Sequence, residues 1–502
     1  MTADLKENAL ADQTEFRASI DKAEPKGKNE QQQALYTEFA TKDEEWKEYH
    51  TKKLLRKVDI RLLPCLVIMY LLNILDRSNL AQARQGTLEE DLGMKGTDFN
   101  LATSILFVGY LLMQLPSNMI ITRVRPSLYL AAATSLWGVV SCCNAAANNL
   151  TSLIVIRFFL GFVEAPFFPG AIFLMSSWYT RKEMTRRISW FYSGNALANM
   201  FGGLLAAGVL GNLHDALGIA GWRWLFIIEG SITIFVALCA WWILPNYPAT
   251  TEWLTEEERH FAEWRLLEDI NESDDRHATT VLGGAKLALK DYRLYIFLLF
   301  QHMSLLSQTF QYFFPSIVGT LGYGKIETLL LTVPVWFATF LVSVLVTYTS
   351  SRSGDRSLHI FSLMLVATIG NAIATGTTAL GARFLAMFLM PMGAVSAYQI
   401  IVSWVANSFP RPTVKRSAAI AICNMIGNCA SIYGSYMYPA SAAPQYIPGG
   451  SANAAVCFLV ASLAIGLRFV HKWENKKLER AEQEGATAEG VQRMAAGFRY
   501  IY

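Results

Sequence analysis

The chain has 502 residues, of which 53% are hydrophobic and 17% charged, and its formal net charge is +3 at pH 7. About a quarter of the residues of a soluble domain are usually charged, so this composition argues against a soluble protein. The small net charge, without a basic stripe interleaved with aromatic residues, argues against nucleic-acid binding. The seven cysteines lie in apolar runs without metal-ligand spacing, so we expect no metal and no disulfide framework.

Long apolar runs fill the chain between two polar tails, 1–58 and 473–502. A helix needs about 20 residues to cross the hydrocarbon core of a bilayer. Glycine and proline occur inside several runs, which membrane helices tolerate because neighbouring helices satisfy the freed backbone groups. The sequence therefore predicts an all-α membrane protein with twelve transmembrane helices. The predicted spans are 61–80, 101–121, 127–147, 150–178, 188–213, 222–244, 294–323, 328–351, 357–382, 384–410, 417–446 and 451–467.

Lysine and arginine are distributed unevenly between the short loops. Cytoplasmic loops are enriched in both residues, so we expect the richer set of alternate loops to be cytoplasmic, with both polar tails and the charged loop 245–292. Short surface helices are expected in this loop. Six spans precede it and six follow it, which gives an N-terminal bundle, 59–244, and a C-terminal bundle, 293–472. The basic residues of the richer set are Arg123, Arg125, Arg181, Lys182, Arg186, Arg187, Arg352, Arg356, Arg411, Lys415 and Arg416.

The two halves of the chain resemble each other weakly. Arg157 precedes Trp178 by 21 positions, and Arg383 precedes Trp404 by the same 21. Such a series indicates a parallel repeat of two six-helix bundles, between which transporters hold their substrate near the membrane midplane. The repeat continues with Asn195, eight residues after Arg187, and Asn424, eight residues after Arg416.

Three motifs resemble those of a known family. They are LNILDRSN at 72–79, RFFLGFVEAPFFPG at 157–170 and WRWLFIIEG at 222–230. Together they resemble the major facilitator superfamily, within it the anion:cation symporter family, and most closely the fungal allantoate-permease-like branch. The resemblance covers about 58–475. It implies a monomer in the plasma membrane, without a cofactor, that takes up nutrients such as allantoate, nicotinate or pantothenate by alternating access.

One loop departs from the superfamily pattern. The loop between spans 2 and 3 usually carries an Asp followed by basic residues, but 117–126 reads SNMIITRVRP and lacks the Asp. The basic residue Arg123 is retained. Asp355 and Arg356, in the matching loop of the second half, preserve the motif better, so we expect these three residues to form gating elements.

Asp76, Arg77, Arg157 and Glu164 are among the charged residues inside predicted spans, where each costs about 2.5–3.5 kcal/mol on insertion scales. Arg157 and Glu164 are seven positions apart, close to two helical turns, and share one helix face. Gly161 lies between them and leaves room for a ligand or a neighbouring helix. From the rise per residue, Arg157 is expected at the depth of Asp76 and Arg77, in the outer half of the membrane. Glu164 is expected nearer the midplane.

The four side chains sum to zero charge when both acids are ionised. Protonation of one acid leaves an arginine without its partner, and arginine binds carboxylates bidentately. Burial favours the neutral form of a carboxyl group, so proton uptake and anion uptake would be coupled. The resemblance agrees with these roles and adds a substrate-contacting amide in span 5. The candidate substrate-binding residues are Arg77, Arg157, Asn195 and Asn424, and the candidate proton-coupling residues are Asp76 and Glu164.

Each of these residues also has a structural explanation. Buried ion pairs often specify packing, and intramembrane asparagines often form hydrogen bonds between helices. Glu229 is expected to be structural, fixing span 6 against Arg223. His302 is expected to be a core histidine with satisfied hydrogen bonds.

Three other functions compete with proton-coupled uptake of a small organic anion. A proton-antiport exporter is the main alternative, but 194–203 in span 5 lacks the proline typical of superfamily antiporters. A transporter-like sensor would suit long cytoplasmic tails, whereas these tails are short and are expected to be disordered. An enzyme is not expected, because no nucleophile–base set or phosphate-binding loop occurs.

Overall fold

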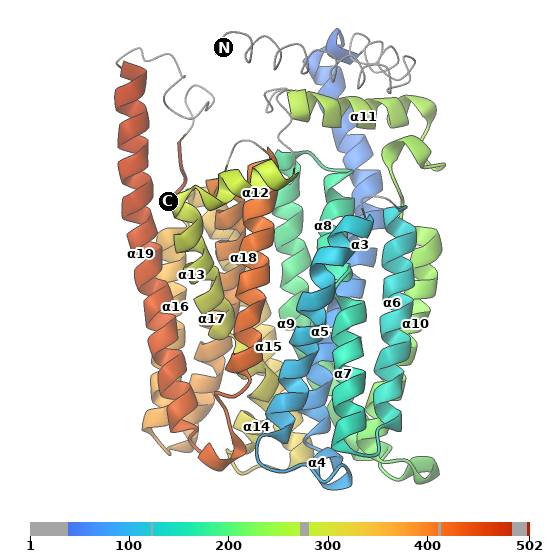
Figure 1. The fold of residues 1–502 in the computed structure, drawn as a ribbon, viewed down its shortest axis with the longest axis vertical. Coiled ribbons are helices and arrows are strands. Elements are labelled where there is room, and N and C mark those ends of the chain that lie inside the picture. The colour runs from blue at the N-terminus through green and yellow to red at the C-terminus, as the bar shows by residue number, and fades with distance from the viewer. Residues whose placement is uncertain (1–38, 122–123, 272–280, 410–412, 484–498) are drawn as a thin grey trace, which may run out of the picture.

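The computed structural model describes residues 39–121, 124–271, 281–409, 413–483 and 499–502, and every regular element of these residues is a helix (Figure 1). Among the described residues, nine helical segments are long and apolar enough to cross a membrane. Three further segments, α5, the α13–α14 pair and α18, run beside them. Together they account for the twelve predicted spans.

The first half contains six spans. The fourth is broken at Ala165 and Pro166, where α7 ends and α8 begins. The helices are α3 (Glu44–Ala83), α4 (Leu88–Asp91), α5 (Asp98–Ile121), α6 (Pro126–Cys143), α7 (Leu150–Glu164), α8 (Phe167–Ser176), α9 (Arg181–Asn212) and α10 (Gly221–Ile243).

The second half also contains six spans. Its first span is interrupted by a 3-10 helix, Thr309–Phe313, between α13 and α14. The central loop forms α11 (Glu256–Asn271) and α12 (Val281–Leu289), which confirms the expected short helices. The remaining helices are α13 (Tyr292–Leu306), α14 (Phe314–Gly319), α15 (Lys325–Ser353), α16 (Ser357–Gly376), α17 (Leu380–Ser408), α18 (Thr413–Gly434) and α19 (Ile447–Gln483).

Two helices extend beyond the predicted bundle boundaries. α3 begins at Glu44 rather than at 59, and α19 continues to Gln483, past 472. The extension of α3 packs on α11, where Lys57 Nζ lies 2.6 Å from Glu258 Oε1. Part of the described N-terminal tail is therefore helical and packs against the central loop.

Close helix contact in the first half depends on glycine. A Cβ on Gly161 of α7 would lie 1.8 Å from the backbone oxygen of Leu106, and one on Gly109 of α5 would lie 2.1 Å from that of Phe158. The backbones of α5 and α7 therefore touch. Gly161 makes room for a neighbouring helix and not for a ligand.

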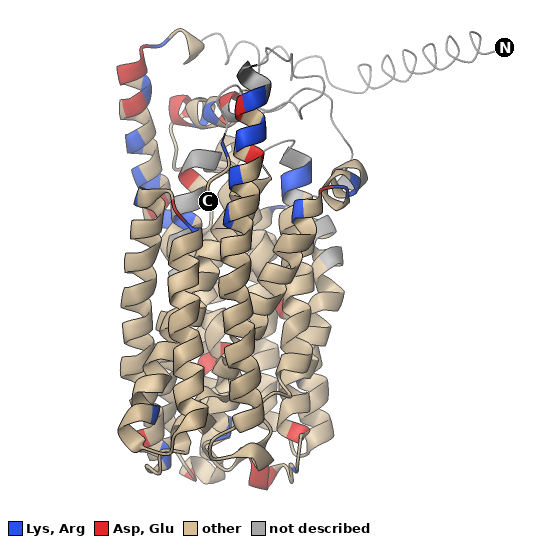
Figure 2. Ribbon diagram, turned by 90° about the vertical axis from the view of Figure 1, so that its left-hand side faces the viewer, with Lys and Arg blue, Asp and Glu red and all other residues tan. Residues whose placement is uncertain are grey.

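Lysine and arginine gather at one end of the bundle, where α11, α12 and Tyr502 also lie; this is called the basic end below (Figures 1 and 2). At the opposite end the two halves are in contact. Asn100 Nδ2 of α5 donates to the backbone oxygen of Ser435 at 2.5 Å, and Lys325 Nζ donates to that of Gly86 at 3.2 Å.

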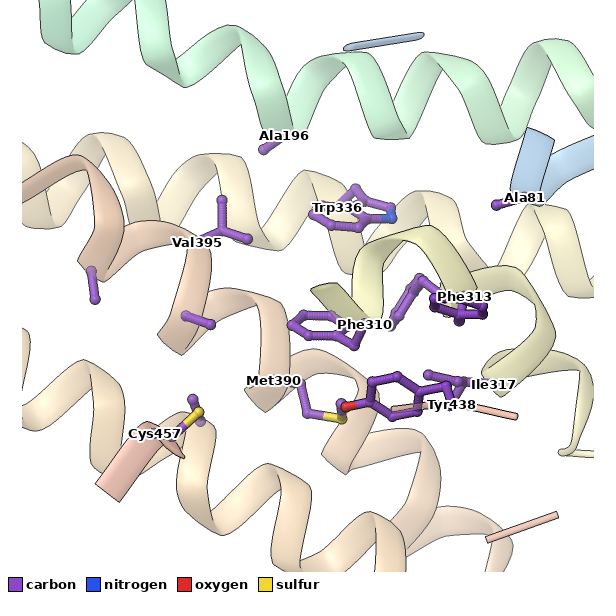
Figure 3. Close-up of a cluster of buried hydrophobic side chains, with 14 of the residues drawn as sticks. Ala81, Ala196, Phe310, Phe313, Ile317, Trp336, Met390, Val395, Tyr438 and Cys457 are labelled. Carbon is purple, nitrogen blue, oxygen red and sulfur yellow. The ribbon is translucent and has the colours of Figure 1, made fainter. Parts of the chain in front are cut away.

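A cluster of buried apolar side chains also joins the halves. Ala81 of α3 and Ala196 of α9 belong to the same cluster as Phe310, Phe313 and Ile317 of the interrupted span (Figure 3). Trp336 and Tyr438 line the same region (Figure 3). Inside a bilayer, close van der Waals packing of such side chains favours contact between the halves.

Candidate functional site

A cavity of about 90 Å³ lies between the two halves. Its walls come from α3, α5, α8 and α9 of the first half and from α13, α17, α18 and the 3-10 helix of the second. Arg77 is the only charged side chain among the described residues that line it. The other polar lining is mostly amide and phenol: Asn73, Asn195, Asn199, Gln308, Gln311, Asn424, Asn428, Tyr70, Tyr110, Tyr192, Tyr312 and Tyr398.

Arg77 and Glu164 form an ion pair at the cavity wall. Arg77 Nε lies 2.7 Å from Glu164 Oε2, and the guanidinium lies over the ring of Tyr110 at 4.7 Å from its centroid. Glu164 is fully buried, and its Oε1 has no hydrogen-bond partner among the described residues. Because Glu164 is the last residue of α7, directly before the break in span 4, the carboxylate is held at a helix end inside the bundle.

Asp76 points away from this pair although it precedes Arg77 in the chain. Its carboxylate accepts hydrogen bonds from Trp137 Nε1 at 2.5 Å and from Ser141 Oγ at 2.6 Å, both on α6. Asp76 is not among the described residues that line the cavity. Two donors from one neighbouring helix supply hydrogen bonds to the carboxyl oxygens, without a cation in direct contact.

Arg157 is buried behind the cavity wall. Its side chain is 1% exposed and it is not among the described lining residues. Its Nε and Nη1 atoms have no hydrogen-bond partner within the described chain. The guanidinium interacts electrostatically with both Glu164 and Asp76. A buried guanidinium within electrostatic range of two acids can balance part of their negative charge.

Asn195 and Asn424 both line the cavity, from opposite halves. Each has a second asparagine one turn later, Asn199 on α9 and Asn428 on α18, that also lines it. These two residues were not predicted from the sequence. Their signal was present in the sequence, because an asparagine follows four positions after each predicted one.

Glu229 of α10 is a third buried acid in the first half. It is 1% exposed, and neither carboxylate oxygen has a hydrogen-bond partner among the described residues. Asn79 of α3 lies within reach of it, with its own amide also unbonded. The predicted contact with Arg223 is wrong, because Arg223 donates to the backbone oxygen of Ala145 at 2.5 Å.

His302 of α13 lies outside the cavity lining. Its Nδ1 is 2.8 Å from the backbone oxygen of Ile426, and its Nε2 is 2.5 Å from Tyr433 Oη. A carbonyl can only accept, so Nδ1 donates to Ile426. Both ring nitrogens have hydrogen-bond partners, as expected, although the residue is half-buried and not in the core.

Asp355 and Arg356 tie three helices together at the basic end. Asp355 pairs with Arg468 of α19, and Arg356 Nη1 donates to the backbone oxygen of Ser403 of α17 at 2.6 Å. Burial acts to raise the pKa of Asp355, but the hydrogen bonds it accepts outweigh burial and lower it. The third predicted gating residue, Arg123, lies outside the described residues.

Matching ion pairs link the ends of the repeat-related helices. In the first half, Arg187 of α9 holds both oxygens of Asp59 of α3 at 2.7 Å. In the second half, Lys415 of α18 and Arg293 of α13 hold Asp291 at 2.7 and 2.6 Å. Burial alone would raise the pKa of Asp291, but Arg293 and Lys415 lower it to about 2.

Residues Tyr500–Tyr502 dock on the basic end of the second half. Trp404 Nε1 donates to the backbone oxygen of Ile501 at 3.0 Å, and the N–H of Arg356 donates to the last backbone oxygen at 2.6 Å. Asn475 of α19 exchanges two further hydrogen bonds with this segment, at 2.8 and 2.9 Å. The expectation of a disordered C-terminal tail is wrong for these three residues.

Comparisons with solved structures agree with the fold. The chain matches a bacterial homologue of the human lysosomal transporter Spinster, in an inward-facing and occupied conformation, with a TM-score of 0.59 and 16% identity over 80% of this chain and 95% of that one. At this identity the likeness supports the fold alone.

Sequence comparisons give the family. Residues 66–435 match the model of the Major Facilitator Superfamily. The chain is 35% identical to the MFS-type transporter cnsO of Penicillium expansum, over 85% of this chain and 84% of the relative. It is 32% identical to the major facilitator-type transporter hxnP of Emericella nidulans, over 86% of this chain and 88% of the relative. It is also 30% identical to a relative from Agrobacterium vitis whose name gives tartrate as its candidate cargo. This match covers 77% of this chain and 84% of the relative. The chain therefore belongs to the major facilitator superfamily and is a membrane transporter, not an enzyme.

Proposed function

We propose that this transporter takes up a small organic anion with a carboxylate group together with protons, by alternating access. The observation that carries the proposal is the Arg77–Glu164 ion pair at 2.7 Å on the cavity wall. Arginine stays charged and matches a carboxylate with two parallel hydrogen bonds. A substrate carboxylate and Glu164 therefore compete for one guanidinium.

A proton decides this competition. When Glu164 accepts a proton, the ion pair with Arg77 is lost and the guanidinium is free to bind a substrate carboxylate. When the proton leaves, Glu164 recovers Arg77 and the substrate is released. An unpaired buried charge is strongly unfavourable. States that hold only the proton or only the substrate carboxylate are therefore disfavoured. One proton and one carboxylate are then carried together.

Asp76 and Arg157 support this exchange from behind the wall. Arg157 interacts with both acids, so it compensates Asp76 while Arg77 is engaged by substrate. We propose Asp76 as a second proton-coupling site, held by Trp137 and Ser141. Arg157 would reach substrate only after a rearrangement of span 4, whose break at Pro166 lies beside Glu164.

The distribution of charge supports an orientation. Cytoplasmic loops are enriched in lysine and arginine, so the basic end would face the cytoplasm, with both polar tails. The contacts Asn100–Ser435 and Lys325–Gly86 then close the outer side. The Asp355–Arg468 and Arg356–Ser403 contacts belong to the inner side, where we propose that they, with Arg123, control opening.

The anion:cation symporter family and its allantoate-permease-like branch fit these residues best. The tartrate named for the Agrobacterium vitis relative is a carboxylate, which agrees with a carboxylate cargo here. Nicotinate, allantoate and pantothenate are further candidates of this class. We propose a monomer in the plasma membrane, since the cavity is complete within one chain.

Proteoliposomes test the proposal. Radiolabelled nicotinate, allantoate, pantothenate and tartrate are each offered with an inward proton gradient. Symport predicts accumulation of at least one of them and its collapse with a protonophore. Accumulation that requires an outward gradient, or efflux driven by the inward one, would instead support the antiport exporter.

Two variants test the exchange. Arg77→Ala is expected to abolish binding of the transported acid, because it removes the only charged residue of the described cavity lining. Glu164→Gln is expected to retain counterflow of labelled against unlabelled substrate but to lose proton-driven accumulation. Arg223→Ala serves as the control, since this arginine of α10 does not line the described cavity. Proton-driven transport in both site variants would refute the assigned roles.

A further inference from the structure

Two asparagine pairs face each other across the cavity with the same internal geometry. In α9, Asn199 Nδ2 lies 3.0 Å from the backbone oxygen of Asn195 and 3.0 Å from its Oδ1. In α18, Asn428 Nδ2 lies 2.8 Å from the backbone oxygen of Asn424 and 3.3 Å from its Oδ1. The two halves thus repeat one arrangement at the site.

The backbone fixes which way each amide points. A backbone carbonyl only accepts hydrogen bonds, so the NH₂ end of Asn199 must face the oxygen of Asn195. That NH₂ also meets the Asn195 side chain, which must therefore present its oxygen to it. The NH₂ group of Asn195 is turned the other way. The same reasoning orients Asn424 through Asn428.

The groups left over are hydrogen-bond donors on the cavity wall. Asn195 and Asn424 both line the cavity. Neither Nδ2 atom belongs to the described side-chain atoms that are buried without a hydrogen-bond partner. With the guanidinium of Arg77, the wall offers donors from both halves. A ligand without acceptors for these donors displaces the water molecules that bind them and forms no hydrogen bonds in their place.

We infer that Asn199 and Asn428 are positioning residues that hold Asn195 and Asn424 as donors, and that the substrate carries a second hydrogen-bond acceptor besides its carboxylate. This inference rests on the proposed function. The second acceptor is a carbonyl oxygen or an aromatic ring nitrogen. Because the two donors belong to different halves, a ligand that engages both also holds α9 and α18 together.

Matched pairs of acids test the second acceptor. Nicotinate and benzoate differ by a ring nitrogen, and succinamate and 4-methylpentanoate differ by a carboxamide in place of an isopropyl group. Binding of all four to the purified full-length transporter is measured by calorimetry. In at least one pair, the acceptor-bearing acid is expected to bind about tenfold more tightly, which corresponds to about one hydrogen bond.

Variants test the positioning role. Asn199→Leu and Asn428→Leu keep a branched side-chain shape but remove the donor, so the amides of Asn195 and Asn424 can turn. The tenfold preference is expected to disappear. Asn199→Gln keeps an NH₂ group and is expected to restore part of the preference.

Asn453→Leu is the matched control. It breaks another buried amide pair, in which Asn453 Nδ2 donates to Asn371 Oδ1 at 3.0 Å, away from the cavity. It is expected to lower the melting temperature without changing the preference, whereas a merely structural role of Asn199 would give the same pattern as this control.

The outcomes separate the two proposals. Equal binding within both pairs, lost in Arg77→Ala, would overturn the second acceptor but leave carboxylate transport intact. A preference that persists in both leucine variants would overturn the positioning role. If none of the four acids and none of the labelled acids above binds, the proposed function and this inference both fall.

Discussion

Asp76 and Arg77 are neighbours in the chain, yet their side chains leave α3 in different directions. Arg77 reaches the cavity and Glu164, whereas Asp76 is held by two donors of α6 inside the first bundle. Adjacent residues on a helix are separated by about 100° around its axis. Asp76 and Arg77 therefore link the cavity to the interior of the first bundle, where Arg157 interacts electrostatically with Asp76 and Glu164.

The contact between α5 and α7 predicts a steep steric penalty at Gly161. Gly161→Ala places a Cβ 1.8 Å from the backbone oxygen of Leu106, an overlap that no rotamer relieves. Overpacking usually costs about 1–3 kcal/mol, and backbone overlap is expected to exceed this. Gly161→Ala should abolish the monodisperse peak in fluorescence-detected size-exclusion chromatography. Gly208→Ala, where nothing lies within 4 Å, should elute like the wild type, and a normal profile for both would contradict the contact.

Glu229 is predicted to tolerate a neutral replacement. It has no hydrogen-bond partner and no ion pair among the described residues, so Glu229→Gln removes no cation's partner. We expect the melting temperature in detergent to change by less than about 2 °C. Asp291→Asn, which deprives two cations of their shared partner, should lower it clearly more. An equal loss in both variants would mean that Glu229 has an ionic partner.

The ion pairs of Asp291 predict that the stability of the fold depends on pH. The pKa of Asp291 falls from 3.8 to about 2 on folding, so its ionised form is stabilised in the folded state. The contribution is fully present above the unfolded value and is lost as the pH falls from about 4 to about 2. Melting curves between pH 7 and pH 2.5 should show a smaller loss on acidification for Asp291→Asn. Parallel curves for variant and wild type would exclude this role.

Docking of Tyr500–Tyr502 predicts a role for Trp404 in stability. Trp404→Phe keeps the aromatic ring but removes the hydrogen bond to Ile501. A bond of about 1 kcal/mol corresponds to about 2–4 °C in melting temperature. Trp242→Phe, at a site that is 80% exposed, provides the control. If removal of residues 500–502 abolishes the effect of Trp404→Phe, the two act through one contact; additive losses would argue against it.

Much of the site could be predicted from repeat spacing. Asn195 and Asn424 were found from their equal distances to basic residues, and both line the cavity. The same spacing did not reveal that Asn199 and Asn428 share the wall. Gln308 and Gln311 were also missed, because the interruption of their span by a 3-10 helix has no clear hydropathy signal.

The sequence by itself determined the twelve spans, their division into two halves and the clustering of basic residues at one end. These properties are local and additive, because each span needs only enough apolar residues to cross the lipid. Tertiary structure alone decided that Glu164 pairs with Arg77, that Asp76 faces α6, and that Gly161 accommodates a helix. Such contacts depend on the rotation of each helix about its axis and on how closely neighbouring helices approach, and packing between distant segments sets both.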